Sequence, residues 1–377
     1  MKHRLLTLAA AAGLAVSASF AGGAQAAEGR FAAFLPPGNP VVGQGAEPFI
    51  ERVAKDTNGE LTYKLFAGGA LLGGKNMVEG LQTGVADIGQ IVFGYFPAEF
   101  PYATLIADMA IYGSNAPAIA AAVSEFALLN CAGCLEEFKK LGLVHLGGTS
   151  TSPYVLMSRD KIETLDELKG KKVRTPGALW DRWVRDAGGT PVNISAGEIY
   201  EAMSRGQVDA VLNAFGAMKS HSLWDAAKHV TNLQLGTYRS WGIFTVSARH
   251  WESLSPAHRR VLLDNAARGI LQAALGYIAT DDAARAEIGQ HNVSVHEPSD
   301  GMRQQLANFL ENDRPSIVEN AKTKLNIPNP EPLMDTFVAL VEKWETLYAP
   351  LGKDLDKMTE LLMQEVYSKI DEKSHGL

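Results

Sequence analysis

Blocks with strand and helix periodicity alternate along most of the chain. Apolar spacing at Phe49, Ile50 and Val53 predicts a helix over residues 43–57, and the alternation that follows predicts a strand over residues 61–66. Further strands are predicted over residues 29–34, 88–93, 142–157, 172–174, 210–215 and 243–248, and the pattern from residue 256 onward is mostly helical, including 333–348. Such alternation is typical of an α/β protein.

One helix-to-strand unit occurs twice. Residues 78–88, VEGLQTGVADI, are echoed in outline by residues 200–210, YEAMSRGQVDA. In each copy a short amphipathic helix reaches a glycine that can adopt a left-handed C-cap, and an aspartate, Asp87 or Asp209, follows three residues later before an apolar strand. We interpret these aspartates as turn-stabilising residues. The repeat predicts two α/β lobes of similar build with a cleft between them.

The chain is also long enough for two lobes, because about 350 residues exceed what one ordinary core organises. We assign residues 27–151 and 240–279 to the first lobe, and residues 152–239 and 280–377, with the C-terminal helices, to the second. The small polar tract 149–153 interrupts a strand pattern, which suits a crossover between lobes. The strand at 243–248 is expected to return the chain to the first lobe.

The N-terminus has the pattern of a secretory signal peptide. Lys2 and Arg4 precede an apolar run from Leu5 to about Phe20, and residues 24–26, AQA, form a small-x-small cleavage site. The alternative is a membrane anchor, but the run is shorter than the roughly 18 to 20 residues that span a bilayer. We expect cleavage of residues 1–26 and a mature chain in the periplasm that does not insert into the membrane.

Charge limits the partners of the mature chain. The formal net charge of −7 becomes −9 once Lys2 and Arg4 are removed. This balance argues against nucleic acid and against anionic membrane surfaces. An acidic protein that binds an anion must supply positive charge locally.

The two cysteines, Cys131 and Cys134, form a C-x-x-C motif late in a predicted helical run, Ala116 to Phe138. In an exported chain the first interpretation is a local disulfide. A thioredoxin-like redox role is disfavoured, since that motif should open a helix. A zinc site would need two more ligands, and a c-type haem would need a histidine where Leu135 stands.

Two polar residues at strand ends are the first candidates for ligand binding. Arg174 follows a short strand and precedes a Thr-Pro-Gly loop, which is where open α/β sheets place ligand groups. Its guanidinium matches a carboxylate, although an exposed or salt-bridged arginine is the plainer alternative. Asn213 ends the second echoed strand, where it either faces a cavity or is a satisfied buried amide.

Aromatic residues at predicted strand ends are the candidates for the rest of the pocket, each with a place in the core as its alternative. They are Phe34, Phe93, Tyr95, Tyr154, Trp180, Phe215 and Trp241. Catalytic signatures are weak: G-x-S-x-G, H-E-x-x-H and Walker A motifs are absent from the sequence, and the histidines have no metal-ligand spacing. We expect neither a catalytic site nor a metal or cofactor.

Four segments together resemble the DctP family, the periplasmic solute-binding subunits of TRAP (tripartite ATP-independent periplasmic) transporters. They are residues 84–89, GVADIG, 168–176, LKGKKVRTP, 197–203, GEIYEAM, and 206–210, GQVDA. The resemblance covers essentially the whole mature chain. It implies a two-lobed periplasmic binding protein fold, with a mixed sheet flanked by helices in each lobe, a long helix bridging both, and closure around one organic acid.

The resemblance also assigns roles to residues. It implies that Arg174 forms a salt bridge with the ligand carboxylate, that Asn213 contacts the same ligand, and that Ala196 and Glu198 lie near the ligand or orient Arg174. Members that bind larger polyhydroxy acids or dicarboxylates carry a second arginine near the segment 149–154, and this chain has none there. We therefore expect a monocarboxylate with a hydroxyl, keto or apolar body, and membrane permease subunits as partners.

Two other classes of function stay open at this point. One is a binding protein that reports to a sensor kinase. The other is a periplasmic enzyme acting on an organic acid, whose cleft should place a base or nucleophile near Arg174.

Overall fold

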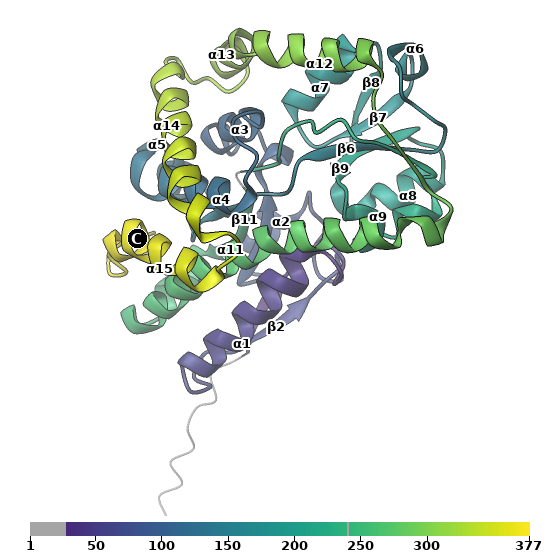
Figure 1. Cartoon of the computed structure of the whole chain (residues 1–377). Helices are drawn as coiled ribbons and strands as arrows, with labels where there is room; N and C mark the ends of the chain where they lie inside the picture. Colours follow the sequence, from purple (N-terminus) through teal and green to yellow (C-terminus); the bar gives the residue numbers. More distant parts are fainter. Residues whose placement is uncertain (1–27, 240) are drawn as a thin grey trace, which may run out of the picture.

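The computed structural model describes residues 28–239 and 241–377, with Trp241 described by its backbone alone. The predicted signal peptide, residues 1–26, lies outside this part of the chain. The described residues form two β-sheets with helices packed on them, as the α/β prediction required (Figure 1).

Each sheet has six strands and mixes parallel with antiparallel pairing. The first sheet has the order β2-β1-β3-β11-β4, with β5 also paired to β11; these strands are β1 (Gly29–Ala32), β2 (Tyr63–Phe66), β3 (Ile88–Val92), β4 (Leu143–His145), β5 (Gly148–Thr149) and β11 (Trp241–Ser247). The second has the order β12-β10-β6-β9-β7-β8; these are β6 (Tyr154–Ser158), β7 (Lys172–Thr175), β8 (Thr190–Asn193), β9 (Ala210–Ala214), β10 (His229–Thr231) and β12 (Ser294–His296). Strand β11 therefore returns the chain to the first sheet.

The echoed unit has the same construction in both lobes. Gly84 and Gly206 have φ of 75° and 70°, which a residue with a side chain rarely adopts. Asp87 then accepts a hydrogen bond from the backbone N of Arg30 at 2.8 Å, and Asp209 accepts one from the backbone N of Lys172 at 2.8 Å. These carboxylates thus bond the adjacent parallel strand, β1 or β7, and not their own turn as we expected. Each aspartate aligns the start of one strand with its neighbour.

Helices and three short irregular helical turns, labelled η, pack on the first sheet. They are η1 (Val41–Ala46), α1 (Glu47–Asp56), α2 (Met77–Gln82), η2 (Phe93–Tyr95), α3 (Pro101–Asp108), α4 (Ala116–Glu125), η3 (Phe126–Asn130), α5 (Ala132–Lys140) and α10 (Ala248–Ser253). Helices on the second sheet are α6 (Leu165–Leu168), α7 (Ala178–Asp186), η4 (Ala196–Glu198), α8 (Ile199–Ser204), α9 (Ala217–Ser220) and η5 (Leu223–Asp225). Helix α6 begins at the predicted capping box of Thr164 and Glu167.

A long helix, α11 (Pro256–Glu287), continues into η6 (Ile288–His291) and bridges the two lobes (Figure 1). It packs on α1, η1 and α4 of the first lobe and on α9 of the second. Arg52 of α1 bonds Asn265 and Gln272, whereas Lys219 of α9 pairs with Glu287. Both lobes are therefore attached to the same helix.

Some of the C-terminal helices pack on a different lobe from the one that we predicted. They are α12 (Asp300–Asn312), α13 (Arg314–Thr323), α14 (Glu331–Tyr348), η7 (Ala349–Leu351), α15 (Leu355–Glu365) and η8 (Tyr367–Lys369). We assigned all of residues 280–377 to the second lobe, but α14 packs on α4 and α15 packs on α11. Trp344 donates to Glu125, and Tyr367 donates to the carbonyl of Leu146. From Glu331 onward the chain is thus part of the first lobe, because its apolar face is buried there.

The helix that carries the cysteines is broken. We expected one run from Ala116 to Phe138, but the chain widens into the π-helical turn η3 and restarts at α5. Cys131 is the N-cap of α5 and is joined to Cys134 by a disulfide. The motif therefore opens a helix after all, but both sulfur-bearing side chains are buried.

Hydropathy of the described residues identifies no single helix that is long and apolar enough to cross a membrane. The segments Ala116–Asn130 and Ala132–Lys140 reach that length and hydropathy only when added together, across a bend of 80°.

Replacing Gly147 with alanine tests how firmly the C-terminal segment packs on the first lobe. Gly147 has φ of 120°, and an added Cβ would lie 2.2 Å from the Tyr367 hydroxyl. The control is Gly142→Ala, where φ is 64° and an added Cβ meets nothing within 4 Å. Strain alone should cost the control about 1–2 kcal/mol. Crowding should cost Gly147→Ala at least about 1 kcal/mol more, measured as the free energy of unfolding in urea. Equal losses would contradict close packing of Tyr367.

Candidate functional site

Arg174 lies at the end of β7 and is buried, with 1% of its surface exposed. Its guanidinium donates from Nε to the carbonyl of Ile194 at 2.9 Å and from Nη1 to the carbonyl of Leu212 at 3.1 Å. Within the described residues it forms no ion pair with a carboxylate. Because a guanidinium has five N–H donors and three bonds are present, two donors have no acceptor in this part of the chain. A buried cation without a counterion is costly unless an anion is supplied.

The first lobe contacts this arginine through Tyr95 of η2. The Tyr95 hydroxyl accepts from Arg174 Nη2 at 3.2 Å and from the backbone N of Ala196 at 2.8 Å. The Tyr95 ring packs edge-on against Phe34, with 6.3 Å between centroids. Close approach continues beside it, since a Cβ on Gly197 would lie 2.9 Å from the carbonyl of Phe34. The two lobes therefore meet over Arg174, in a closed arrangement.

Asn213 lies on the same face of the second sheet as Arg174. Arg174 is paired with Val211 of β9, and Asn213 follows two residues later, which returns its side chain to that face. Asn213 Oδ1 accepts from the backbone N of Ala214 at 2.8 Å. Its Nδ2 has no acceptor among the described residues. An amide donor and two guanidinium donors thus lie on one face at neighbouring strands.

His221 is a further buried polar group that the sequence did not single out. It follows α9, and its Nδ1 lies 3.0 Å from the Ser220 hydroxyl. Its Nε2 is buried and has no partner within the described part of the chain. Burial, with a smaller contribution from the charge of Arg174, lowers the pKa of His221 to about 4. The imidazole is therefore neutral at physiological pH.

Two of the predicted aromatic residues, Tyr154 and Trp180, lie near the contact between the lobes. The rings of Tyr154 and Trp180 are 5.3 Å apart, and Tyr238 stacks on Trp180 at 5.9 Å. Trp180 donates from its indole to the carbonyl of Leu235 at 2.9 Å. The Tyr238 hydroxyl accepts from the backbone N of Gly94, next to Tyr95, at 3.2 Å. This aromatic stack adjoins the segments that cross between the lobes.

Other predicted site residues lie elsewhere. Phe93 packs with Phe100, Phe138 and His145 in the core of the first lobe. Phe215 is buried in the second core, with the Arg285 guanidinium 3.9 Å from its ring centroid. Glu198 is exposed and has no bond to Arg174 among the described residues. The side chain of Trp241 lies outside the described part of the chain.

The bridging helix α11 also bonds both lobes near their contact. Sequence periodicity alone could not identify the residues that do so. Tyr277 donates to Asn39 of the first lobe at 3.4 Å. One turn later, Asp281 accepts from the backbone N of Gly216, just beyond β9, at 2.6 Å. Burial raises the pKa of Asp281 to about 6. Two residues one turn apart on α11 thus contact different lobes.

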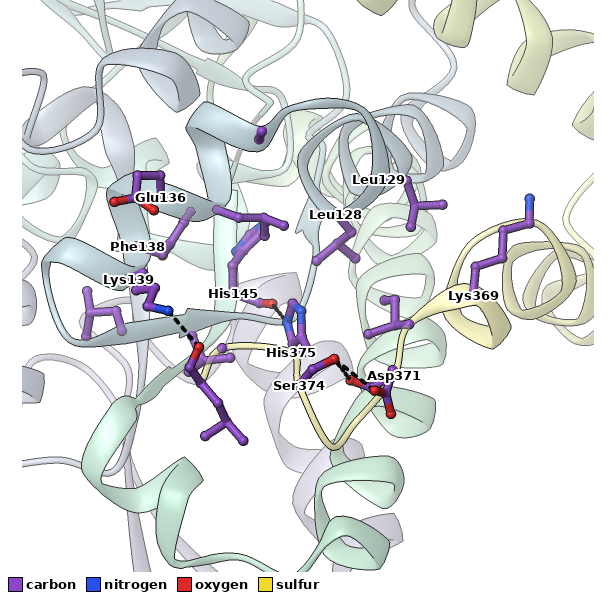
Figure 2. A pocket seen from close by; sticks show the side chains of 17 residues that line it. Leu128, Leu129, Glu136, Phe138, Lys139, His145, Lys369, Asp371, Ser374 and His375 are labelled. Carbon is purple, nitrogen blue, oxygen red and sulfur yellow. Dashed lines mark hydrogen bonds between the residues drawn. The ribbon is translucent and has the colours of Figure 1, made fainter.

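A separate cavity of about 490 Å³ lies between α5 and the C-terminal residues (Figure 2). Lys139 donates to the carbonyl of Leu377 and His375 contacts the carbonyl of His145 across its walls. Its lining comes from the first lobe and the C-terminal segment only. The contact over Arg174 is the better candidate for a ligand site, because both lobes contribute to it and the buried guanidinium has spare donors. No three or more His, Cys, Asp or Glu residues of the described part are placed to hold a metal ion.

Replacing Tyr95 with phenylalanine should weaken the contact between the lobes. The change leaves the Arg174 Nη2 and Ala196 N donors without the hydroxyl, which should lower the free energy of unfolding by about 1–3 kcal/mol. Tyr102→Phe is the matched control, since the Tyr102 hydroxyl has no hydrogen bond among the described residues. Chemical denaturation of both variants provides the measurement. The same stability for both variants would mean that the hydroxyl does not hold Arg174.

His221 should make the protein less stable in acid. The unfolded chain takes up a proton near pH 6.5, whereas the folded chain does so only near pH 4. Stability that is present above pH 6.5 is therefore lost as the pH falls toward 4. Between pH 7 and pH 5 the wild type should lose about 2 kcal/mol more than His221→Gln, measured by urea unfolding. Parallel pH profiles would contradict a neutral, buried imidazole.

Comparison with known proteins gives the family of the chain. Residues 31–320 match the DctP family, described as bacterial extracellular solute-binding protein, family 7. A monocarboxylate 2-oxoacid-binding periplasmic protein of Nostoc is 29% identical over 171 residues, which cover 44% of this chain and 45% of that protein.

Solved structures share the fold. A TRAP solute-binding protein from a marine metagenome, specific for aromatic acids and bound to 3-hydroxybenzoate, superposes with a TM-score of 0.74 at 23% identity, covering 84% of this chain and 98% of that one. A Bordetella pertussis extracytoplasmic solute receptor that binds pyroglutamic acid gives 0.70 at 20% identity, covering 83% and 99%.

The family match spans most of the chain, and the two sheets and the bridging helix have the fold of the solved relatives. The chain belongs to the DctP family of solute-binding proteins, the extracytoplasmic receptors of TRAP transporters.

Proposed function

We propose that this TRAP receptor captures a monocarboxylate between its lobes, with Arg174 as the partner of the carboxylate, and delivers it to the membrane subunits of the transporter. The observation that carries the proposal is the buried guanidinium of Arg174, which has two free N–H donors and no acidic partner among the described residues. Two parallel N–H groups are what a carboxylate accepts in a bidentate pair.

A second buried arginine shows why Arg174 is the better candidate. Arg239 is also fully buried, but its guanidinium donates to the carbonyls of Ala110, Tyr112 and Gly113 and to Thr237. Those bonds attach the segment that contains Thr237 and Arg239, between β10 and β11, to the loop between α3 and α4. Arg239 is thereby committed to the scaffold, and Arg174 is left to pair with a ligand.

Groups around Arg174 suit a ligand with a single charge and a polar or aromatic body. Asn213 Nδ2 and His221 Nε2 can bond a keto or hydroxyl oxygen, and the rings of Tyr95 and Phe34 provide apolar surface. Segment 149–154 supplies no second arginine for a dianion. The ligands named for the relatives, 3-hydroxybenzoate, pyroglutamic acid and monocarboxylate 2-oxoacids, each carry one carboxylate.

Capture then proceeds by hinge closure. In an open state the acid pairs with Arg174 on the second lobe, and Tyr95 of the first lobe completes the site when the lobes meet. The ligand favours closure only through contacts that differ between the two states. We infer that the receptor works in the periplasm after removal of residues 1–26, in agreement with the extracellular family to which it belongs.

Arg174→Gln tests the proposal directly. A thermal-shift screen of the wild type with 3-hydroxybenzoate, pyroglutamate, pyruvate and succinate identifies the best acid, and calorimetry then measures its Kd for each variant. Loss of the charged pair should raise the Kd by about 100-fold.

Arg159→Gln is the matched control, because it removes a more exposed arginine of the same lobe that pairs with Asp209. We expect its Kd to stay within about threefold of the wild type. Wild-type affinity in Arg174→Gln, or a preference for succinate over every monocarboxylate, would refute the proposed binding mode.

A further inference from the structure

An ion cluster joins the two lobes away from Arg174. Arg182 of α7 donates to Asp313 from Nε at 2.8 Å and from Nη2 at 2.6 Å, and to Asp108 Oδ2 from Nη1 at 3.0 Å. Asp108 and Asp313 are 1% exposed and Arg182 is 19% exposed. Asn320 donates to the same Asp108 oxygen at 3.0 Å. The cluster is therefore a buried one, in which two carboxylates share one guanidinium.

The cluster is divided between the lobes in a specific way. Arg182 lies on the second lobe in α7, on which α12 packs, and Asp313 joins the end of α12 to α13. Asp108 and Asn320 lie on the side of the first lobe, where α13 packs on α3. In Figure 1, α12 and α13 follow one another along the edge of the molecule from α7 toward α14. Separation of the lobes would thus break the bond between Arg182 of α7 and Asp108 of α3.

No other ion pair of the described residues connects α1–α5 or the first sheet directly with α6–α9 or the second sheet. A cavity of about 320 Å³ adjoins the ion cluster. It is lined by Gly94, Thr104 and Asp108 from one lobe and by Gly177 and Asn193 from the other. Gly94 is next to Tyr95 in the chain, so this cavity borders the contact over Arg174. Water that enters it reaches the ion cluster where the lobes meet.

We propose that Asp108 and Arg182 form a latch that stabilises the closed lobes and so raises ligand affinity without touching the ligand. In the closed state Asp108 exchanges water for the Arg182 guanidinium and the Asn320 amide. Arg182 stays paired with Asp313 in either state, which keeps it from being buried without a partner. Because apparent affinity scales with the fraction of molecules that close, weakening the latch weakens binding. The affinity part of this proposal rests on the proposed function, whereas the closure part does not.

Disulfide trapping measures closure without any ligand. A Cβ on Gly74 would lie 2.8 Å from the Ser195 hydroxyl, so Gly74→Cys with Ser195→Cys places two thiols together only when the lobes are closed. The native cysteines are already joined to each other. The trapping rate is proportional to the closed fraction even when that fraction is small.

In this background Asp108→Asn should trap about 10-fold more slowly than the parent. Asp108→Asn is preferred to a change at Arg182, because loss of the arginine would leave two buried carboxylates facing each other. Asp335→Asn is the matched control, since Asp335 pairs with Arg314 between α13 and α14 and joins no lobes. It should trap at the parental rate.

The second measurement uses the best acid from the screen and the receptor without the added cysteines. Asp108→Asn should speed dissociation of the acid by about 10-fold with little change in the association rate, and urea unfolding checks that the variant is folded. Equal trapping rates in Asp108→Asn and the parent overturn the latch, whatever the ligand is. If no acid binds, or Arg174→Gln binds normally, the proposed function fails while the trapping result still decides the latch.

Discussion

The constraint on which this structure depends is a desolvated positive charge between two lobes. Arg174 is held in place by the carbonyls of Ile194 and Leu212 and by the Tyr95 hydroxyl, none of which neutralises it. Burying an ion without a counterion is among the more costly things a fold can do. The cost is smaller when the lobes are apart and water reaches the guanidinium, and smaller again when an anion pairs with it. In the proposed function, an unpaired arginine at the point of contact couples closure to the presence of an anion.

The scaffold around Arg174 explains why the charge is held at that point. In each lobe a left-handed glycine and an aspartate fix the start of one parallel strand against its neighbour, through Asp87 and Arg30 or through Asp209 and Lys172. Fixing the start of β9 against β7 sets the register that places Asn213 on the same face as Arg174. Fixing β3 against β1 sets where Tyr95 emerges from the first lobe. The repeat thus aligns the two strand ends that meet over Arg174, and helix α11 contacts both lobes through Tyr277 and Asp281.

Patterns of a few consecutive residues were enough to predict most strands and the repeated helix-to-strand unit. Alternating periodicity located most of the strands but not β8, β10 or β12. A glycine three residues before an aspartate identified the repeated unit, because that signal depends on a few consecutive residues. Strand ends were harder: Phe93 and Tyr95 are two residues apart, but the chain turns into η2 between them, so Phe93 enters the core while Tyr95 reaches the cleft. The helix break at Cys131 arises in an apolar run with no glycine or proline near it before Gly133, so the sequence carried no signal for it. His221 and Tyr277 join the site only through tertiary packing, far from any motif.

Arg174 and Arg182 both contact the first lobe, but their hydrogen-bonding surroundings are opposite. The difference affects the free energy of closing the lobes. Arg174 has donors in excess of acceptors, so closing over it without an anion is unfavourable. Arg182 has two carboxylates for one guanidinium, so closing adds an acceptor to a cation that is already paired with Asp313. Burial raises the pKa of Asp108, which means that its carboxylate form gains less from the contact than an isolated ion pair would suggest. A modest contribution from the latch suits a receptor. A strong latch would close the lobes of the empty protein, whereas without a latch nothing would offset the cost of burying the Arg174 guanidinium on closure. Under the proposed function, an anion that pairs with Arg174 favours closure, because it removes the cost of burying that guanidinium without a counterion.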